Sequence, residues 1–590
     1  MKPISTPIHK NWNVIFFVLL AAMSLLYGYH NIFFMRPWSI HQWRQCDCLS
    51  ITYNYYKEGM HFLSPEVHWS GPTGDGKTST SECPWLYYLI ACLWHIFGYH
   101  EFIYRMVDTA IAFCGLYFLF KLCREVLQDG VWSIFVALFL FTSPIFVYYG
   151  NSFITDVPAL SIALVAWYYF YKFYKEGTNR YFYIWLFFCL LAGLTKITAL
   201  LSFVPIFLLF PIEALGIYRF KESGNIFEKP IQKILPVILF VAIILSWTLY
   251  AVHYNKLHNG GVFSTQTFPI WAAKMHEIQD IARKLYNELL PMYFNGALLL
   301  GVLFLFLAII LLGKQVNKLL LFLCCSVFLG CLLYLLLWFK VFTVHDYYLT
   351  NLLIFIPCVL ITFLHYLKKN QPALFQSKVL KSIAIAILIV NTYYCTIQVR
   401  LRYFPGSPFV KYSFILDKPT LDYWTWYHWD YSNYTKSLET ITPYLRSIGI
   451  KREDKVVSLP DNSINISLYL MDQKGYTGYS IGQGEEKGAL QKLTDDGAKY
   501  LIINNPDIID TSWIKPFTSK KLGQYKNISI FDLRHRMTIN DTINMIIQTI
   551  KNDHTWYSNI ERGAKENNIP MDSALRLNAI WVIKNKQFKL

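Results

Sequence analysis

The stretch of sequence that decides the fold is residues 296–313, which read GALLLGVLFLFLAIILLG and contain no charged side chain. A helix needs about 20 such apolar residues to cross the hydrocarbon core of a bilayer. This run therefore predicts a membrane-spanning helix. Similar runs recur on both sides of it, and we predict eleven spans, the fifth of them short, near residues 12–34, 102–122, 131–149, 155–174, 181–193, 196–215, 232–252, 296–313, 317–338, 347–367 and 378–398.

Charged residues are spread unevenly around these runs. Only 16% of the 590 residues are charged, compared with about 25% in an ordinary soluble domain. Residues 1–398 hold 28 Lys and Arg and 18 Asp and Glu, whereas the much shorter stretch 399–590 holds 26 and 20. This distribution excludes a single soluble globule, a disordered chain and a small disulfide-rich secreted protein. It predicts a polytopic α-helical membrane module over residues 1–398, followed by a water-soluble part.

Lys and Arg in the short loops predict the orientation of the spans. One set of short loops carries 17 of these cations, and the alternate loops carry about 11 over much longer stretches. We therefore expect a cytoplasmic N-terminus and, with an odd number of spans, residues 399–590 outside the cytoplasm. The net charge of +16 is then largely a topology signal. Membrane lipids are the expected partner, and nucleic acid is not.

The water-soluble part shows two patterns. Short apolar segments at 453–457, 499–503 and 527–532 are typical of strands, and helical patterns lie between them. Strands that alternate with helices predict a small α/β domain over residues 399–533. Residues 534–590 predict a tail of about three amphipathic helices, with Trp556, Tyr557, Leu575 and Trp581 as its core.

Three carboxylates are candidates for chemistry because each lies on the predicted outer face of the membrane module. Asp47 stands in the first outer loop (35–101), at the start of an amphipathic helix over 50–59. Glu82 precedes a second interfacial helix, and Asp156 lies in a tight turn between two spans. Each could simply cap a helix. Each could also act as a general base or help to hold a divalent metal, although no cofactor is certain.

Cations on the same face are the natural counterpart of these acids. A phosphate at headgroup level needs such groups to neutralise it and to stabilise it as a leaving group. The cysteines of the first outer loop, Cys46, Cys48 and Cys83, could pair, but spacing alone does not show it. The candidate phosphate-binding residues are Arg44, Lys196, Arg283, His345 and Tyr347.

The order of these features resembles a known family. The matching segments are Glu82 to Tyr88, Phe97 to Arg105, Leu194 to Lys196 and His345 to Leu349. Together, over about residues 12–400, they resemble the type-C glycosyltransferases of the protein O-mannosyltransferase and lipid A aminoarabinose transferase superfamily. No single motif is specific, but their order and topology together are.

The resemblance implies an enzyme of the bacterial cytoplasmic membrane with an extracytoplasmic active site. It would take a sugar from a polyprenyl-phosphate carrier and pass it to a protein, lipid or glycan acceptor. It assigns the catalytic role to Asp47, with Asp156 as a second acid. The chain departs from many relatives in having Asp47-Cys48 and Glu82-Cys83, which removes a second acid and a phosphate-binding lysine.

Two other functions remain open at this point. A lipid-linked oligosaccharide ligase or polymerase would share the topology and differ in the size of its donor. A transporter of lipid-linked sugars would need a polar pathway through the membrane, which the predicted spans do not show.

Overall fold

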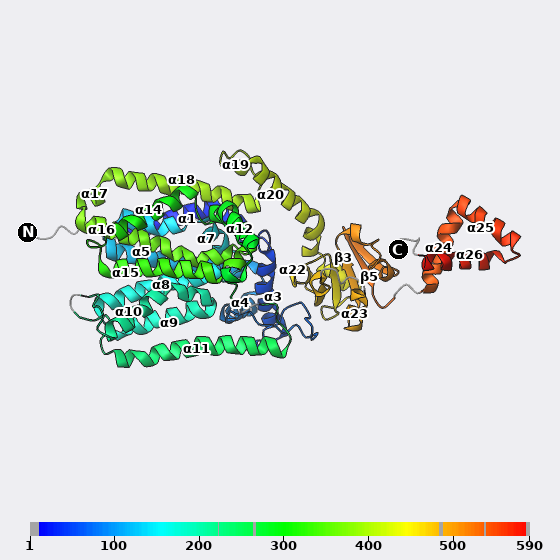
Figure 1. The fold of residues 1–590 in the computed structure, drawn as a ribbon, viewed down its shortest axis with the longest axis horizontal. Coiled ribbons are helices and arrows are strands. Elements are labelled where there is room, and N and C mark those ends of the chain that lie inside the picture. Colours follow the sequence, from blue (N-terminus) through cyan, green and yellow to red (C-terminus); the bar gives the residue numbers. More distant parts are fainter. Residues whose placement is uncertain (1–10, 222–223, 264–266, 483–487, 536–538, 586–590) are drawn as a thin grey trace, which may run out of the picture. The chain divides into compact units, whose positions relative to one another are not determined.

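The structure is a computed structural model that describes residues 11–221, 224–263, 267–482, 488–535 and 539–585. The chain forms two compact units (Figure 1). The first consists of Met1–Glu66 and Lys77–Trp426, and the second of Val67–Gly76 and Tyr427–Leu590. A short piece of the first predicted outer loop thus belongs to the second unit.

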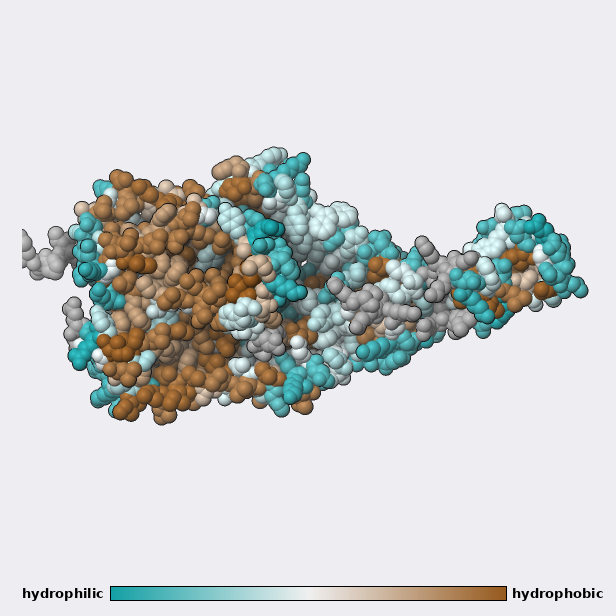
Figure 2. All heavy atoms as spheres, in the orientation of Figure 1, coloured by the Kyte–Doolittle hydropathy of each residue, from teal (hydrophilic) through white to brown (hydrophobic). Residues whose placement is uncertain are grey.

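The first unit is a bundle of helices whose sides are covered by hydrophobic residues (Figure 2). Its helices are α1 (Asn11–Tyr27), α2 (Tyr29–Ile32), α3 (Gln42–Glu58), α4 (Trp85–Phe97), α5 (Glu101–Leu127), α6 (Gly130–Leu140), α7 (Pro144–Gly150), α8 (Asp156–Glu176), α9 (Asn179–Thr195), α10 (Val204–Ala214), α11 (Pro230–Leu257), α12 (Met275–Lys284), α13 (Leu290–Tyr293), α14 (Gly296–Leu311), α15 (Lys318–Leu337), α16 (Phe355–Asn370), α17 (Pro372–Gln376), α18 (Lys378–Tyr403) and α19 (Pro408–Lys411). Helix α20 (Lys418–Asp430) runs across the boundary between the units.

The helices support a multi-pass membrane protein. Among the described residues, five helices are long and apolar enough to span a bilayer: α5, α11, α15, α18 and the segment Tyr347–Asn370 that ends with α16. The number rises to seven if each of two bent helix pairs counts as one span. Other predicted spans are helical but short: α1 and α9 have 17 residues and α10 has 11.

One of the predicted spans, 131–149, is broken. Helices α6 and α7 meet at an angle of 73°. The break lies at Ser143, which has an extended backbone (ψ 119°) and directly precedes Pro144. A residue before proline avoids the helical conformation, and proline itself lacks the N–H that would continue the ladder.

The second unit contains a five-stranded sheet with the order β2-β1-β3-β5-β4. Strands β1 (Val456–Leu459), β2 (Gly475–Thr477) and β3 (Tyr500–Ile503) are parallel, whereas β4 (Lys521–Tyr525) and β5 (Ile528–Asp532) are antiparallel to their neighbours. Helices α21 (Thr442–Ser447), α22 (Ile466–Leu470) and α23 (Ala489–Asp495) connect or flank the strands. The predicted strands are β1, β3 and β5. The sequence pattern missed β2, which has three residues, and β4, which has no alternating apolar face.

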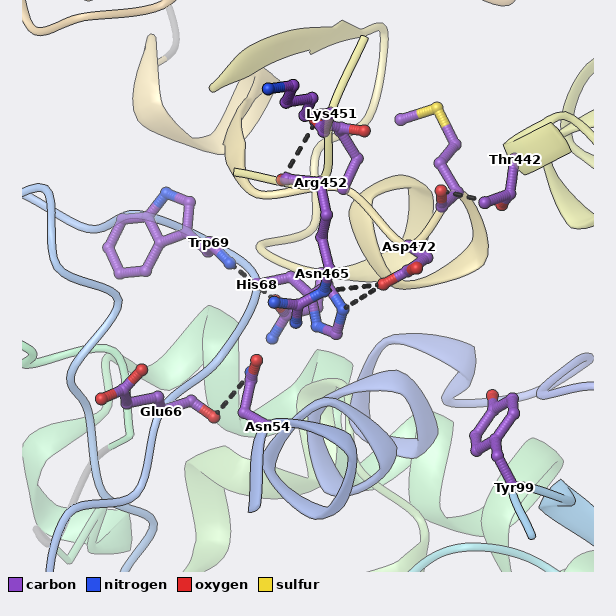
Figure 3. Close-up of polar contacts among 12 residues, drawn as sticks. Asn54, Glu66, His68, Trp69, Tyr99, Thr442, Lys451, Arg452, Asn465 and Asp472 are labelled. Carbon is purple, nitrogen blue, oxygen red and sulfur yellow. Dashed lines mark hydrogen bonds and ion pairs between the residues drawn. The ribbon is translucent and has the colours of Figure 1, made fainter. Parts of the chain in front are cut away.

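The segment 67–76 extends this sheet at the free edge of β2. Trp69 forms a parallel bridge with Gly475, whose N–H donates to the His68 carbonyl at 3.2 Å. The backbone N–H of Trp69 donates to Asn465 Oδ1 at 3.1 Å. His68 lies buried beside Asp472, which Arg452 also holds at 2.8 Å (Figure 3). A loop that leaves the helical unit is therefore built into the α/β fold.

The tail forms the three expected helices, α24 (Ile539–Asn552), α25 (His554–Glu566) and α26 (Met571–Lys584). Leu575 is in their shared core, and Trp556 and Tyr557 pack against it. The prediction for Trp581 is wrong, because this side chain is 51% exposed. The inner face of α26 is formed by Leu575, Ala579 and Val582 at helical spacing, and this spacing places Trp581 on another face.

A prediction follows from Gly475. Its φ of +152° is one that other residues rarely adopt, and a Cβ there would clash with the Val456 carbonyl oxygen. We expect Gly475→Ala to lower the free energy of unfolding of the second unit by about 1–3 kcal/mol. Pulse proteolysis of the full-length protein in urea measures this loss. Gly563→Ala in α25, where a Cβ meets nothing within 4 Å, is the control, and equal behaviour of the two variants would contradict the expectation.

His68 predicts a pH dependence of the same unit. Burial is the main cause that lowers the pKa of His68, to about 4, from an ordinary value of about 6.5. The unfolded chain therefore binds more protons between these values, so the stability contribution is full above pH 6.5 and is lost as the pH falls toward 4. The loss should reach about 3 kcal/mol. The His68→Gln variant should show a flatter profile in the same assay; identical profiles would refute a buried, neutral His68.

Candidate active site

A buried cluster of opposite charges joins four elements of the helical unit. Arg44 Nη2 on α3 lies 2.8 Å from Glu82 Oε1, which precedes α4. Lys196, at the end of α9, places Nζ 3.0 Å from the same Glu82 oxygen and 3.2 Å from Asp156 Oδ2 at the start of α8. The four side chains are at most 11% exposed. We call Arg44, Glu82, Asp156 and Lys196 the charge cluster.

The contacts of the charge cluster argue against a simple capping role for two of the acids. Helix α4 has no side-chain hydrogen bond at its N-cap, Pro84, and α8 has none at Thr155. The described side-chain contacts of Glu82 and Asp156 are instead ion pairs with Arg44 and Lys196. Burial alone would raise the pKa of Glu82, but the charges of Arg44 and Lys196 hold it well below its usual range. Glu82 is therefore an ionised anchor for the cations and a poor proton acceptor.

Asp47 does not stand at the start of its helix as predicted. Helix α3 begins at Gln42, eight residues before the predicted helix, so Asp47 lies in its second turn. The residues from Gln42 to Asp47 contain no glycine or proline and continue the helix toward the N-terminus. An N-cap role for Asp47 is therefore excluded. The side chain is on the same helix as Arg44, three residues further along, and is only 2% exposed.

A second polar cluster lies around Asp346, just before the span Tyr347–Asn370. His41 Nε2 lies 3.0 Å from Asp346 Oδ1, and the Tyr149 hydroxyl donates to the same oxygen. Arg402 Nη2, at the end of α18, lies 3.5 Å from Oδ2. Burial opposes ionisation here too, but contact with His41 and the charge of Arg402 lower the pKa of Asp346. We call His41, Tyr149, Asp346 and Arg402 the Asp346 cluster.

Tyr347 connects the two clusters. The centre of its ring lies 5.3 Å from Lys196 Nζ and 4.9 Å from the centre of the His41 ring, to which it is nearly perpendicular. Tyr348 also places its ring 5.3 Å from Lys196 Nζ. An ammonium over aromatic faces gains cation–π stabilisation without an added counter-charge. The two clusters are thus neighbours within one site.

Of the two remaining predicted residues, His345 lies in the site and Arg283 lies outside it. His345 is in the site, with its ring 5.4 Å from His41 and 5.1 Å from Tyr347. Burial, followed by the charges of His41 and Lys196, lowers the pKa of His345 to about 3, so it is neutral at physiological pH. Arg283 is apart from both clusters: it is 71% exposed on α12, and its described ion pair is with Asp280 at 3.5 Å.

Sequence reasoning missed four residues of the site: His41, Tyr149, Asp346 and Arg402. The sequence could have pointed to two of them. His41 lies three residues before the candidate Arg44, and Asp346 directly follows the candidate His345. Tyr149 and Arg402 had no such signal beyond their places near the ends of apolar helices. Tyr149 and Arg402 contact Asp346 from 197 and 56 positions away in the chain. Contacts between such distant positions cannot be predicted from the local sequence pattern.

Cysteines and metal ligands add little to the site. Cys46, Cys48 and Cys83 are buried, and Cys48 Sγ lies 3.4 Å from the Tyr87 hydroxyl. Within the described part of the chain, no group of three or more His, Cys, Asp or Glu side chains is arranged to hold a metal ion.

Comparison with known proteins identifies the fold. Residues 81–250 match the sequence model of the family described as dolichyl-phosphate-mannose-protein mannosyltransferase. The structure is similar to ArnT from Cupriavidus metallidurans in the apo state (10% identity, TM-score 0.53) and bound to undecaprenyl phosphate (11% identity, TM-score 0.54); each comparison covers 89% of this chain and 98% of ArnT. An oligosaccharyltransferase from Archaeoglobus fulgidus is more distantly similar (14% identity, 83% of this chain and 68% of that one, TM-score 0.46). No curated protein sequence matches the chain.

These findings confirm the predicted fold class. The chain has the type-C glycosyltransferase fold, with a bundle of apolar helices and a small sheet in the C-terminal region. The matched family and ArnT are glycosyltransferases. The family match includes Glu82, Asp156 and Lys196 of the charge cluster.

The charge cluster predicts a large effect of removing its shared cation. Lys196→Met leaves Asp156 without its described ion pair and Glu82 with Arg44 alone, and breaking a buried ion pair costs about 3–5 kcal/mol. We expect a lower melting temperature of the purified protein in detergent, measured by fluorescence-detected size exclusion. Adding Asp156→Asn to Lys196→Met should recover part of the loss. Lys314→Met, an exposed lysine, is the control; a Lys196→Met protein as stable as this control would show that the cluster is not a structural unit.

Proposed function

We propose that this protein is an integral-membrane glycosyltransferase that transfers a sugar from a polyprenyl-phosphate carrier to an extracytoplasmic protein, lipid or glycan acceptor. The observation that carries the proposal is the buried charge cluster beside Tyr347, in a chain with the type-C glycosyltransferase fold. The similar ArnT structure with undecaprenyl phosphate supports the same class of carrier. The excess of cations in one set of short loops supports an active site on the extracytoplasmic side.

The charge cluster suits the departure of a phosphate. Glu82 and Asp156 hold the two cations in place, yet among the described residues Arg44 uses only its Nη2 group on Glu82. A guanidinium has five N–H donors and an ammonium has three. Arg44 and Lys196 therefore keep donors for an incoming phosphate oxygen. Tyr347 and Tyr348 line the same place and add hydroxyl groups.

The reaction is a single displacement at the anomeric carbon of the sugar. The acceptor oxygen or nitrogen forms a bond to this carbon while the bond from the carbon to the phosphate oxygen breaks. The electron pair of the broken bond stays on the carrier, which leaves as polyprenyl phosphate with one more negative charge. Arg44 and Lys196 stabilise this developing charge, and the proton of the acceptor must move to a base. Asp47, buried one turn from Arg44 on α3, orients the acceptor or removes its proton.

This role predicts that Asp47→Asn loses activity and keeps its fold. We expect the rate to fall by about 100-fold or more, because Asn lacks the charge that orients the acceptor or removes its proton. The purified protein in liposomes is given undecaprenyl-phosphate sugars extracted from its own host cells, and release of undecaprenyl phosphate is measured. Asp280→Asn, which changes a 67% exposed carboxylate, is the matched control.

Two results would overturn the proposal. Undiminished release by a folded Asp47→Asn protein removes Asp47 from the mechanism. Movement of the intact donor across the liposome membrane without release of undecaprenyl phosphate by the unaltered protein would make it a transporter and not a transferase.

A further inference from the structure

We infer that His41, oriented by Asp346, is the group that takes the proton from the acceptor, while Asp47 positions the acceptor. This inference rests on the proposed function and assigns a step that the charge cluster does not perform. Glu82 is bound by both Arg44 and Lys196, which lower its pKa and make it a weak base, and Asp156 is held in an ion pair with Lys196. The site therefore needs a base whose lone pair is not already used.

His41 contacts Asp346 through Nε2, so the lone pair on its other ring nitrogen, Nδ1, is available to accept a proton. Asp346 is ionised, so the ring nitrogen 3.0 Å from it, Nε2, carries the hydrogen and donates it. In a neutral imidazole the other nitrogen, Nδ1, is then the acceptor. Among the described residues no hydrogen bond to Nδ1 is found, and the His41 side chain is 12% exposed. A carboxylate that fixes the tautomer of a histidine base and stabilises the imidazolium is a recurrent arrangement in catalysis.

The backbone around His41 has an uncommon conformation and is held in place by several hydrogen bonds. Ser39 and His41 both have a left-handed backbone, with φ of +71° and +54°, which is uncommon for residues other than glycine. Gln45 Nε2 donates to the carbonyls of Trp38 and Ile40, both at 3.0 Å. The Ser39 hydroxyl donates to the Arg402 carbonyl at 2.9 Å. Strain that the surroundings enforce in this way is typical of functional sites.

His41 also lies at the right place relative to the leaving group. Tyr347 contacts both His41 and Lys196, and Arg44 lies three residues after His41, in the first turn of the helix that His41 precedes as N-cap. The charge cluster can thus face the phosphate on one side of the sugar while His41 faces the acceptor. The titratable and charged groups around His41 are Tyr149, His345, Asp346, Tyr347 and, beyond Asp346, Arg402.

The proton balance of the step is complete. The acceptor hydroxyl or amine loses its proton to His41 Nδ1 as its bond to the anomeric carbon forms, and His41 becomes an imidazolium paired with Asp346. The polyprenyl phosphate leaves with the electron pair of the broken bond. The imidazolium later gives its proton to water, because His41 is partly exposed, and no oxidant, reductant or further reactant is required.

The test measures undecaprenyl phosphate release by the full-length protein in liposomes from pH 5 to 9. The wild-type rate should fall as the pH is lowered, because a protonated His41 cannot take the proton of the acceptor. His41→Gln can keep the hydrogen bond to Asp346 but has no basic nitrogen, so its rate should be about 100-fold lower and should lose this acid limb. Asp346→Asn should show an intermediate loss. His253→Gln, an exposed histidine on α11, should match the wild type.

Azide separates a role in proton transfer from a structural role. Azide is a nucleophile that has no proton to lose, so it should restore undecaprenyl phosphate release by His41→Gln with formation of a glycosyl azide. It should not restore release by Arg44→Lys, which is weakened in binding the leaving phosphate. A His41→Gln protein with an unchanged pH profile, or with a loss that azide does not restore, would overturn the inference. Failure of the wild-type protein to release undecaprenyl phosphate would instead overturn the proposed function.

Discussion

A charge buried away from water must have a partner, and this constraint organises the helical unit. Lys196 satisfies it by binding Glu82 and Asp156 at once, and Glu82 in turn binds Arg44. These four residues come from α3, the segment before α4, the start of α8 and the end of α9. Removing any of them leaves an uncompensated charge in a region of low dielectric constant. The relative positions of these elements are therefore set by electrostatics at one end of the bundle and by apolar packing along its length.

The same constraint separates two kinds of chemistry within one site. The charge cluster contains two cations and two carboxylates, and in the proposed function its unused donors bind the departing phosphate. The Asp346 cluster contains a carboxylate whose neighbours are a histidine, a tyrosine and an arginine. Tyr347 contacts Lys196 of the charge cluster and His41 of the Asp346 cluster. A displacement reaction that places negative charge on one product and releases a proton from the other reactant fits this division.

The sequence predicts the parts of the molecule that depend on composition over many residues. Apolar runs predict the helical bundle, and short apolar segments predict β1, β3 and β5. Asp47, Glu82, Asp156, Lys196, His345 and Tyr347 stand out because polar residues at the ends of apolar runs are uncommon. Short or irregular elements are not predicted: the break before Pro144, the three-residue strand β2 and the early start of α3 are decided by local backbone geometry and tertiary contacts.

Long-range partners are also beyond the reach of the linear pattern. Asp346 stands next to His345 in the chain, but its role depends on His41 and Tyr149, which are brought to it only by the fold. Arg283 shows the opposite case: it is a cation in a predicted outer loop, but its side chain is 71% exposed and lies outside both clusters. Resemblance to a family suggests a catalytic role for Asp47 and Asp156. It does not supply the residues that are particular to this chain.

The segment 67–76 has a consequence for how the chain is made. Its hydrogen bonds to Asn465 and Ser480 join residues separated by 396 and 411 positions. During synthesis this segment is complete long before its partners exist, so its contacts form only after most of the helices have been translated. A fragment that begins at residue 427 would lack the strand-like neighbour of β2 and the buried His68. A single cut in the chain therefore cannot separate the complete second unit from the first. The second unit can fold completely only after the helices of the first unit have been translated.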